Sequence, residues 1–580
     1  MDQREIAEVF EQIADLLELK GENPFRIQAY RRAALNLKNL SEDLRLLAET
    51  NGLERIPGIG KDLSAKILEM LQTGKLRYLD ELKKQVPASL AELLTIPGVG
   101  PKTARLVYDR FHAKSIDDLE RLARTGKLRA IPGFQAKKEE NILRGVALVK
   151  TGKERMPLGE AMEAAEEVLK GIKTLKGIKR LSVAGSLRRC KETVRDLDIL
   201  IASPQPEKVM DGFVRLPFVA AVQAQGETKS SIRTRQGIQV DLRVVPLDSF
   251  GAALLYFTGS KEHNIRLRSL ANRSGLTINE YGIFHEKDGK KFAGREEEEI
   301  YEVLGLSWIP PELREDRGEI EAARKGLLPQ LVDAKDIEGS FHNHSTWSDG
   351  RHSIEEIAGA VRKQGYRYMI LSDHSQSLRI AKGLSEARIL AQLKEVGALN
   401  RRLKPFRILT GSEVDILPDG RLDYPDAVLK KLDVVIAAVH SAFKQPKEMM
   451  TRRIVKAVRN RYVSILAHPT GRLLGERDPY ALDMEAVFRE AARTGTAMEI
   501  NCCTVRMDLN DVYARQAKEC GAKLVISTDT HALEQLGTLK LGVAMARRAW
   551  VGPKDILNSM GADELLRWVA RKRDVTAEKT

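Results

Sequence analysis

Nine histidine and carboxylate side chains in the second half of the sequence lie at or beside the ends of predicted strands. Seven of the ten histidines come after residue 340. Imidazole together with carboxylate suits Mn²⁺, Zn²⁺ or Fe²⁺ better than Mg²⁺, and two or three such ions can generate hydroxide at neutral pH and hold a phosphodiester for attack. The candidate ligands are His342, His344, Asp349, His374, Glu413, His440, His468, Asp529 and His531.

Three aspartates in the first half form a second candidate metal site. Asp196 and Asp198 lie two residues apart in the predicted strand RDLDILIA, so both carboxylates share one face. Asp241, in the predicted strand IQVDLRVVP, can complete the site. Two Mg²⁺ ions would relieve the repulsion between these carboxylates, activate a hydroxyl group and stabilise a phosphate leaving group.

A turn ahead of these aspartates is suited to a triphosphate. Gly185 and Ser186 precede the pair Arg188-Arg189. Backbone N–H groups, a hydroxyl and a guanidinium at such a turn can all contact phosphate oxygens.

A repeated pattern in the first 150 residues predicts helix-hairpin-helix motifs. The copies are LERIPGIGKDLSAKI (53–67), LLTIPGVGPKTARLV (93–107) and LRAIPGFQAKKEENIL (128–143), of which the third lacks the second glycine. The glycines permit a tight turn, and the next helix N-terminus can hold a phosphate of the DNA backbone without reading sequence. The predicted DNA-binding residues are Gly58, Gly60, Lys61, Gly98, Gly100, Lys102 and Thr103.

Composition supports these assignments but does not place the DNA. The chain of 580 residues is too long for one core, and its net charge of +14 favours a polyanionic partner. Four cysteines without a C-x-x-C pair argue against a zinc ribbon or a disulfide framework. No apolar run reaches 18 residues, so we expect no membrane association and a cytoplasmic location close to the nucleoid.

The elements that must position these residues change along the chain. Short helices fill the first 150 residues, strand-rich runs follow from about residue 179, and helix and short strand return at 250–320. Beyond the polar stretch 317–339, apolar strands alternate with helical segments. This alternation predicts a βα barrel, in which side chains at the carboxyl ends of the strands converge on one face.

The N-terminal segment resembles the lyase domain of DNA polymerase beta, through FRIQAYRRAA, RIPGIGKDLSAKI and TGKLRYLDEL. The resemblance implies that Lys66 forms a Schiff base with a 5′-deoxyribose phosphate, and that Arg26 and Tyr30 bind the 5′-phosphate. One phosphate-binding lysine of that family is Asp62 in this sequence.

The middle of the chain resembles family X DNA polymerases. G-S-x-R-R followed by D-x-D is similar to their nucleotidyltransferase signature, and YFTGSKEHNIRLRSLANRSGLTINEYGIF (256–284) is similar to the thumb of DNA polymerase beta. Two departures are Lys261 in place of an acid and Gln239 in place of an arginine. The implied nucleotide-binding residues are Gly185, Ser186, Arg189, Tyr256, Phe257, Gly259, Asn264 and Arg268.

The ligand order H-x-H, S-D-G, S-D-H, E, H, A-H-P and D-x-H resembles the polymerase-and-histidinol-phosphatase (PHP) family, whereas His352 falls outside the set. Together the resemblances imply a bacterial family X polymerase with a C-terminal PHP domain. They imply gap filling in base-excision repair, a Mn²⁺-dependent 3′→5′ exonuclease and, as a lesser expectation, cutting at abasic sites. The implied cofactors are two Mg²⁺ ions in the polymerase site and two to three Mn²⁺ or Zn²⁺ ions in the PHP site.

We therefore expect a multidomain fold with helical helix-hairpin-helix domains, an α+β nucleotidyltransferase palm and thumb like those of DNA polymerase beta, and a PHP-type βα barrel. The expected partners are gapped or nicked duplex DNA, its 3′ ends and dNTPs, and we expect a monomer. The predicted domains are 1–85 (lyase-like), 86–150 (fingers), 151–247 (palm), 248–318 (thumb), 319–337 (linker) and 338–575 (PHP).

Two alternatives stay open at this point. The PHP domain of an active polymerase could be a small-molecule phosphatase resembling histidinol phosphatase. The whole chain could instead be a DNA-end-binding scaffold with weak catalysis, although the complete sets of carboxylates and ligands argue against this.

Overall fold

The computed structural model describes residues 3–38, 44–49, 52–56, 58–85, 99–130 and 155–577, together with single positions between 93 and 146. Two units divide the chain, Met1–Glu154 and Arg155–Thr580. They correspond to the helical first part of the sequence and to the part that contains the predicted strands.

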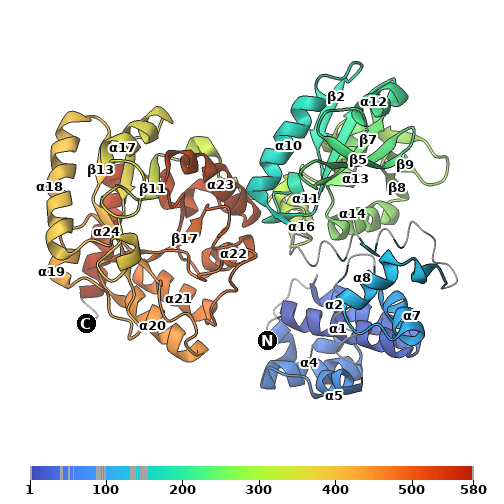
Figure 1. The fold of residues 1–580 in the computed structure, drawn as a ribbon, viewed down its shortest axis with the longest axis horizontal. Helices are drawn as coiled ribbons and strands as arrows, with labels where there is room; N and C mark the ends of the chain where they lie inside the picture. Colours follow the sequence, from blue (N-terminus) through green and yellow to red (C-terminus); the bar gives the residue numbers. More distant parts are fainter. Residues whose placement is uncertain are drawn as a thin grey trace. The chain divides into compact units, whose positions relative to one another are not determined.

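Unit 1 is helical throughout its described residues. Apolar side chains recur every three or four positions and form one buried stripe per helix; on the first helix Ile6, Phe10, Ile13 and Leu17 are fully buried. The helices, several of which are labelled in Figure 1, are α1 (Gln3–Lys20), α2 (Pro24–Lys38), α3 (Leu44–Glu49), α4 (Lys61–Thr73), α5 (Arg77–Gln85), α7 (Pro101–Phe111) and α8 (Ile116–Arg124), with short 3-10 turns η1 (Leu53–Arg55) and η2 (Lys127–Ala130).

The first two repeats adopt the same backbone turn. In each copy, the N–H of the residue between the two glycines donates a hydrogen bond to the carbonyl three residues earlier. These bonds run from Ile59 to Ile56 and from Val99 to Ile96, each at 3.0 Å. In both copies the second glycine caps the helix that follows. The central positions of the third copy, 131–138, lie outside the described residues.

Unit 2 begins with the predicted palm, a five-stranded sheet in the order β2-β4-β7-β6-β5. The central strands β4 and β7 run parallel, and the outer pairs are antiparallel. The parallel register places Asp198 beside Asp241. The elements are β1 (Met156–Pro157), α10 (Leu158–Ile172), β2 (Arg180–Val183), α11 (Gly185–Arg188), β3 (Thr193–Val194), β4 (Asp196–Ala202), α12 (Pro206–Phe213), β5 (Val219–Gln225), β6 (Lys229–Thr234) and β7 (Gln239–Val245).

The predicted thumb combines helices with a three-stranded antiparallel sheet in the order β10-β9-β8. Its apolar core includes Ile320 and Ala323, which belong to the polar segment predicted as a linker. That segment therefore contains a packed helix, and the domain boundaries stay predictions. The elements are α13 (Phe250–Thr258), α14 (Lys261–Arg273), β8 (Leu276–Asn279), β9 (Gly282–His285), β10 (Lys291–Ala293), α15 (Glu297–Val303) and α16 (Glu319–Arg324).

The C-terminal region confirms the expected parallel βα barrel. Its strands form two parallel sheets, β11-β12-β13 and β14-β15-β16-β17-β18. Isolated bridges join the two sheets at two places, between His374 and Glu413 and between Asn343 and Thr530. The strands are β11 (Gly339–Asn343), β12 (Tyr368–Leu371), β13 (Arg407–Leu409), β14 (Gly411–Asp415), β15 (Val434–Ala438), β16 (Val463–Leu466), β17 (Ala497–Asn501) and β18 (Leu524–Ser527).

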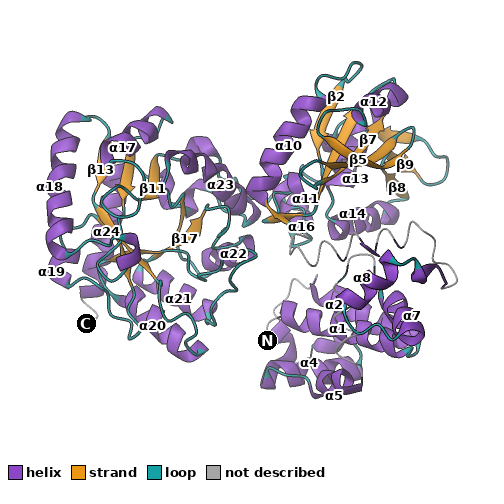
Figure 2. Cartoon of the chain, viewed as in Figure 1, coloured by secondary structure: helices purple, strands orange, loops and turns teal. Residues whose placement is uncertain are grey.

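Helices cover the outside of these strands, as Figure 2 shows. Apart from Arg407 at the start of β13, the strands are buried along their whole length, which is expected of a parallel sheet covered by helices. The helices are α17 (Ile354–Lys363), α18 (Glu386–Arg402), α19 (Asp426–Leu429), α20 (Lys447–Arg459), α21 (Met484–Thr494), α22 (Asp511–Glu519), α23 (Leu539–Arg548) and α24 (Ala562–Ala577).

Candidate functional site

The three palm aspartates lie together on β4 and β7. Leu197 and Val240 point into the core and are fully buried, so the alternating carboxylates face the other way. Burial, together with the charges of Asp196 and Asp241, raises the pKa of Asp198 to about 7. Burial and Asp241 likewise raise the pKa of Asp196. A cluster of carboxylates that disfavours its own charge fits divalent cations, which neutralise it.

Gly185 lies against this carboxylate cluster. Its φ of +60° is in the left-handed region, and a Cβ atom there would lie 2.0 Å from Asp198 Oδ2. The neighbouring Ala184 N–H donates to the Asp198 carbonyl at 2.8 Å. The predicted triphosphate turn, with Ser186 at the start of α11, is thus built directly onto the metal-site strand.

Arg189 is held by two contacts within this unit. Its Nε donates to Glu315 Oε1 at 3.0 Å, and its Nη1 donates to the Thr258 carbonyl. Nη2 makes no hydrogen bond among the residues that the structure describes. Gly259, at φ +71°, lies close by, and a Cβ atom there would be 3.1 Å from Arg189 Nη1.

Three of the five predicted nucleotide-binding residues of the thumb region line one small pocket, whereas Phe257 and Gly259 do not. Tyr256, Asn264 and Arg268 line it together with apolar side chains, and Asn264 Nδ2 donates to the Tyr256 carbonyl at 2.7 Å. The Arg243 guanidinium lies over the Phe257 ring, with its Cζ atom 4.2 Å from the ring centroid.

Gln239, which stands where the beta family has an arginine, contacts the third carboxylate. Its Nε2 donates to Asp241 Oδ1 at 3.1 Å. A neutral amide therefore holds Asp241 in place of a guanidinium.

In unit 1, Lys66 is ion-paired with Asp62, the residue that departs from the lyase pattern. Its Nζ also lies 5.1 Å from the Tyr78 ring centroid, and Arg26 lies 5.5 Å from the same ring. Tyr30 stacks on Tyr78. The structure thus brings together the predicted lyase residues.

The predicted DNA-binding residues of unit 1 differ in how they are placed. Gly58, at φ +79°, has side-chain atoms of Arg32 3.2 Å from where a Cβ would lie. Lys61 is exposed at the start of α4, whereas Thr103 is buried. Gly60 and Gly100 cap their helices, and Gly98 and the Lys102 side chain lie outside the described residues.

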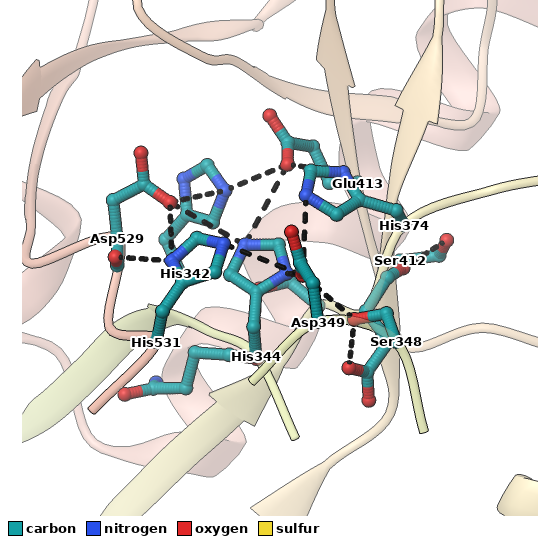
Figure 3. Close-up of polar contacts among 12 residues, drawn as sticks. His342, His344, Ser348, Asp349, His374, Ser412, Glu413, Asp529 and His531 are labelled. Carbon is teal, nitrogen blue, oxygen red and sulfur yellow. Dashed lines mark hydrogen bonds and ion pairs between the residues drawn. The ribbon is translucent and has the colours of Figure 1, made fainter. Parts of the chain in front are cut away.

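Glu413 contacts most of the histidines among the predicted PHP ligands, and Figure 3 shows it beside His342, His344 and His374. Its Oε2 faces His342 Nε2 at 3.3 Å and His374 Nδ1 at 2.9 Å, and its Oε1 faces His440 Nε2 at 3.2 Å and His468 Nε2 at 2.8 Å. Burial alone would raise the pKa of Glu413, but the surrounding histidines hold it well below its usual range. One carboxylate with a separate set of imidazoles on each oxygen is suited to bridge two metal ions.

Eight of the nine predicted ligands fall into three groups with the spacing of metal ligands. His468 lies outside these groups but contacts Glu413. The groups are His344, Asp349, His374 and His531; His342, His344 and Asp529; and His374, Glu413 and His440.

Buried ligand atoms without a well-formed hydrogen bond show that the cluster fits metal ions. Within the described residues, His342 Nε2, both ring nitrogens of His344, His374 Nδ1 and Glu413 Oε2 are buried without a well-formed hydrogen bond. Such orphaned polar atoms are costly unless something coordinates them. Burial, with the charges of His531 and His374, lowers the pKa of His344 to about 3, which keeps this imidazole in the neutral form that binds metals.

Backbone strain accompanies the ligands. His342 (φ +62°), His468 (φ +26°) and Asp529 (φ +50°) all have left-handed backbone conformations. Each costs on the order of 1–3 kcal/mol in a residue with a side chain, and such residues gather at functional sites.

Sequence reasoning missed the residues that orient the ligands. Glu499 accepts a hydrogen bond from His342 Nδ1 at 2.6 Å, and Asp415 accepts one from His440 Nδ1. Both contacts leave Nε2 directed at the centre, the usual arrangement of a metal-bound histidine. A lone glutamate inside the apolar strand TAMEINC was the available signal for Glu499.

Family models of known proteins match four segments of the chain. Family models match the helix-hairpin-helix domain at residues 1–76, the SAM-like helix-hairpin-helix tandem at 90–147, the DNA polymerase beta thumb at 253–315 and the PHP domain at 340–500. Among the described residues no helix is long and apolar enough to cross a membrane.

Individual relatives cover either the whole chain or its halves. The DNA polymerase/3′–5′ exonuclease PolX of Bacillus subtilis (strain 168) is 40% identical over 573 residues, which is 98% of this chain and 100% of that protein. DNA polymerase lambda of Rattus norvegicus is 27% identical over 340 residues, 53% of this chain and 56% of that protein. A probable phosphatase of Thermoanaerobacter sp. (strain X514) is 29% identical over 229 residues, 38% of this chain and 89% of that protein.

A palm carboxylate cluster, a beta-type thumb and a PHP centre on one chain define a family X DNA polymerase that carries a second, hydrolytic centre. Similarity over nearly its full length then decides the subgroup. The chain belongs to the PolX family of DNA polymerase/3′–5′ exonucleases.

Gly185→Ala should reduce primer extension by about a hundredfold, because an ångström-scale displacement of a catalytic group has effects of that size. The new Cβ would overlap the Asp198 carboxylate, and the left-handed backbone adds strain. The measurement is kcat/KM for single-nucleotide insertion. Gly237→Ala is the matched control, since Gly237 also has a positive φ but open space around its Cβ position. Equal losses in both variants would contradict the close-contact argument.

Proposed function

We propose that this chain fills short gaps in duplex DNA at the palm site and shortens 3′ ends at the PHP centre, as a base-excision repair enzyme. The observation that carries the proposal is the presence, in unit 2, of two metal-type centres of different chemistry. The palm centre offers carboxylates alone, which suit Mg²⁺, and the PHP centre offers imidazoles as well, which suit Mn²⁺ or Zn²⁺.

In the palm, the chain's own groups divide the work of nucleotide addition. Asp196, Asp198 and Asp241 would hold the divalent ions, which activate the primer hydroxyl and neutralise the leaving pyrophosphate when bound. The Gly185–Ser186 turn would bind the triphosphate. Arg189 would add a guanidinium contact, because Glu315 and the Thr258 carbonyl hold its side chain in one orientation.

In the PHP centre, the nine ligands would hold two or three ions around Glu413. Glu499 and Asp415 orient two of the imidazoles, and the exposed Asp349 and half-buried His531 leave the centre accessible to substrate and water. The same centre supports the lesser proposal of cleavage at abasic sites, because both reactions hydrolyse a phosphodiester bond of DNA.

The test uses a 5′-labelled primer on a one-nucleotide gap. With dNTPs the primer should lengthen by one nucleotide, and without dNTPs it should shorten from its 3′ end. A chelator should stop both reactions, Mg²⁺ should restore extension, and Mn²⁺ should restore shortening. A protein that changes the primer in neither direction would contradict the proposal.

The likeness of the C-terminal half to a probable phosphatase supports a second candidate, a small-molecule phosphatase in the PHP centre. Release of phosphate from histidinol phosphate, without shortening of labelled DNA by the same preparation, would favour this candidate over the nuclease.

A weak 5′-deoxyribose phosphate lyase is proposed for unit 1. Schiff-base formation needs a lysine amine that is free to attack the sugar, and the ion pair with Asp62 holds the Lys66 Nζ atom. Asp62→Ala should therefore increase borohydride trapping of a 5′-deoxyribose phosphate substrate severalfold, and Lys66→Ala should abolish it. Asp80→Ala, which removes an exposed acid elsewhere in unit 1, is the control. Trapping that survives in Lys66→Ala would assign the nucleophile to another residue.

A further inference from the structure

An arginine of the PHP domain reaches the nucleotide turn of the palm. Arg548, at the end of α23, is 2% exposed. Its Nη1 donates to the Arg189 carbonyl at 2.6 Å and to Glu315 Oε1 at 3.1 Å. Its Nη2 donates to Asp511 Oδ2, at the start of α22, at 2.7 Å. One side chain therefore connects two PHP helices with the polymerase site.

Glu315 is the shared acceptor in this network. Besides Arg548, it pairs with Arg189 Nε at 3.0 Å and with Lys191 Nζ at 3.4 Å. Although burial by itself would raise the pKa of Glu315, the surrounding cations lower it to about 2. The carboxylate therefore stays charged and can act as a fixed anchor for the Arg189 guanidinium.

The network carries more positive than negative charge. Four cations, from Arg189, Lys191, Arg317 and Arg548, share the carboxylates of Glu315 and Asp511. A net positive charge at a partly buried turn attracts an anion. The excess suits the triphosphate that the Gly185–Ser186 turn is proposed to bind.

Close packing keeps the two domains in contact at this place. Gly159, on the palm helix α10, lies so near the PHP domain that a Cβ would be 2.6 Å from Thr504 Cγ2 and 3.2 Å from Leu541 Cδ1. A further ion pair joins Arg472 of the PHP domain to Glu192 of the palm at 2.7 Å. Arg548 thus acts across an interface that is already tightly packed.

We propose that Arg548 is a positioning residue of the polymerase nucleotide site, through which the PHP domain fixes the backbone and the guanidinium of Arg189. Its Nη1 holds the Arg189 carbonyl directly and holds the Arg189 side chain through Glu315. The triphosphate-binding surface is then shared between the domains, and the PHP domain contributes to nucleotide addition independently of its own metal centre. This inference rests on the proposed polymerase function.

The experiment measures single-nucleotide insertion on a gapped primer in the full-length protein. Arg548→Ala should raise the KM for dNTP by about tenfold, because a hydrogen bond to a charged group corresponds to a factor of this size, and should change kcat less. Arg548→Lys should recover part of the loss. Combining Arg548→Ala with Glu315→Ala should add little to the larger single effect, since both act through Arg189.

Arg547→Ala is the matched control. Arg547 ends the same helix but bonds to Glu312 and to the Val332 carbonyl, so its loss should leave the KM for dNTP unchanged. Primer shortening, measured on the same preparations, reports whether the barrel is folded. Arg548→Ala leaves no carboxylate unpaired, because Glu315 keeps Arg189 and Lys191, and Asp511 keeps Arg317.

An unchanged KM in Arg548→Ala, or an equal rise in Arg547→Ala, would overturn the positioning role. If primer shortening also fails in Arg548→Ala, the barrel of that variant is damaged and Arg548→Lys becomes the test. In Arg548→Lys the KM for dNTP must rise while primer shortening stays intact. An unchanged KM for dNTP in Arg548→Lys would overturn the proposal. A wild-type protein that inserts no nucleotide would overturn the proposed polymerase function and, with it, this role for Arg548.

Discussion

Replacing Asp196 with alanine should abolish primer extension and leave primer shortening intact. The carboxylate lies on β4 beside Asp198, with Asp241 in register on β7, and burial together with the charge of Asp241 raises the pKa of both Asp196 and Asp198. Removing one of three ligands should cost about 4 kcal/mol or more of transition-state stabilisation, which is roughly a thousandfold in kcat. Single-turnover insertion on a one-nucleotide gap measures the loss.

The control for this variant is Asp211→Ala. Asp211 is an exposed palm aspartate that accepts a hydrogen bond from Gln225 and lies on α12, outside the carboxylate cluster. It should retain full extension. Extension that persists in Asp196→Ala would place the polymerase centre elsewhere, whereas loss of shortening in this variant would show that the two centres are not separate.

The clustering of the candidate metal ligands was predictable because its signals are local. Alternation within RDLDILIA is enough to place Asp196 and Asp198 on one face, and the parallel pairing of β4 with β7 then brings in Asp241. The PHP ligands follow the same logic, because the carboxyl ends of parallel strands meet on one face of a barrel. The first helix-hairpin-helix turn was equally readable, since its first glycine, Gly58, has the positive φ that the turn requires.

The partners of these residues were not predictable, because tertiary packing selects them. Nothing in the sequence near Arg189 indicates Arg548, which lies some 359 positions away and contacts it across domains. The ion pair between Lys66 and Asp62 has the ordinary helical spacing of four, but the Tyr78 ring beside Lys66 Nζ comes from another helix. The segment 317–339 looks like a linker because its charges are frequent, yet Glu319 is fully buried against His263.

Glu413→Gln should reduce the rate of primer shortening about a thousandfold and leave gap filling unchanged. The carboxylate has different imidazoles on each oxygen, His342 and His374 on Oε2 and His440 and His468 on Oε1. An amide keeps the shape but offers one neutral oxygen and an NH₂ group that cannot coordinate a cation. The loss of a bridging anion should remove at least one ion, and with it several kcal/mol of charge stabilisation, in the range of a thousandfold.

Metal content separates this explanation from a simple loss of folding. Atomic absorption on the purified variant should show fewer bound ions per chain than the wild type, and primer extension should show that unit 2 is intact. Glu534→Gln, an exposed glutamate three residues beyond His531, should keep both the metal and the nuclease. A Glu413→Gln protein with full metal content and normal shortening would exclude Glu413 as the bridge. Full metal content with lost shortening would instead assign the carboxylate a role in the chemical step, because the ions alone would then not suffice for hydrolysis.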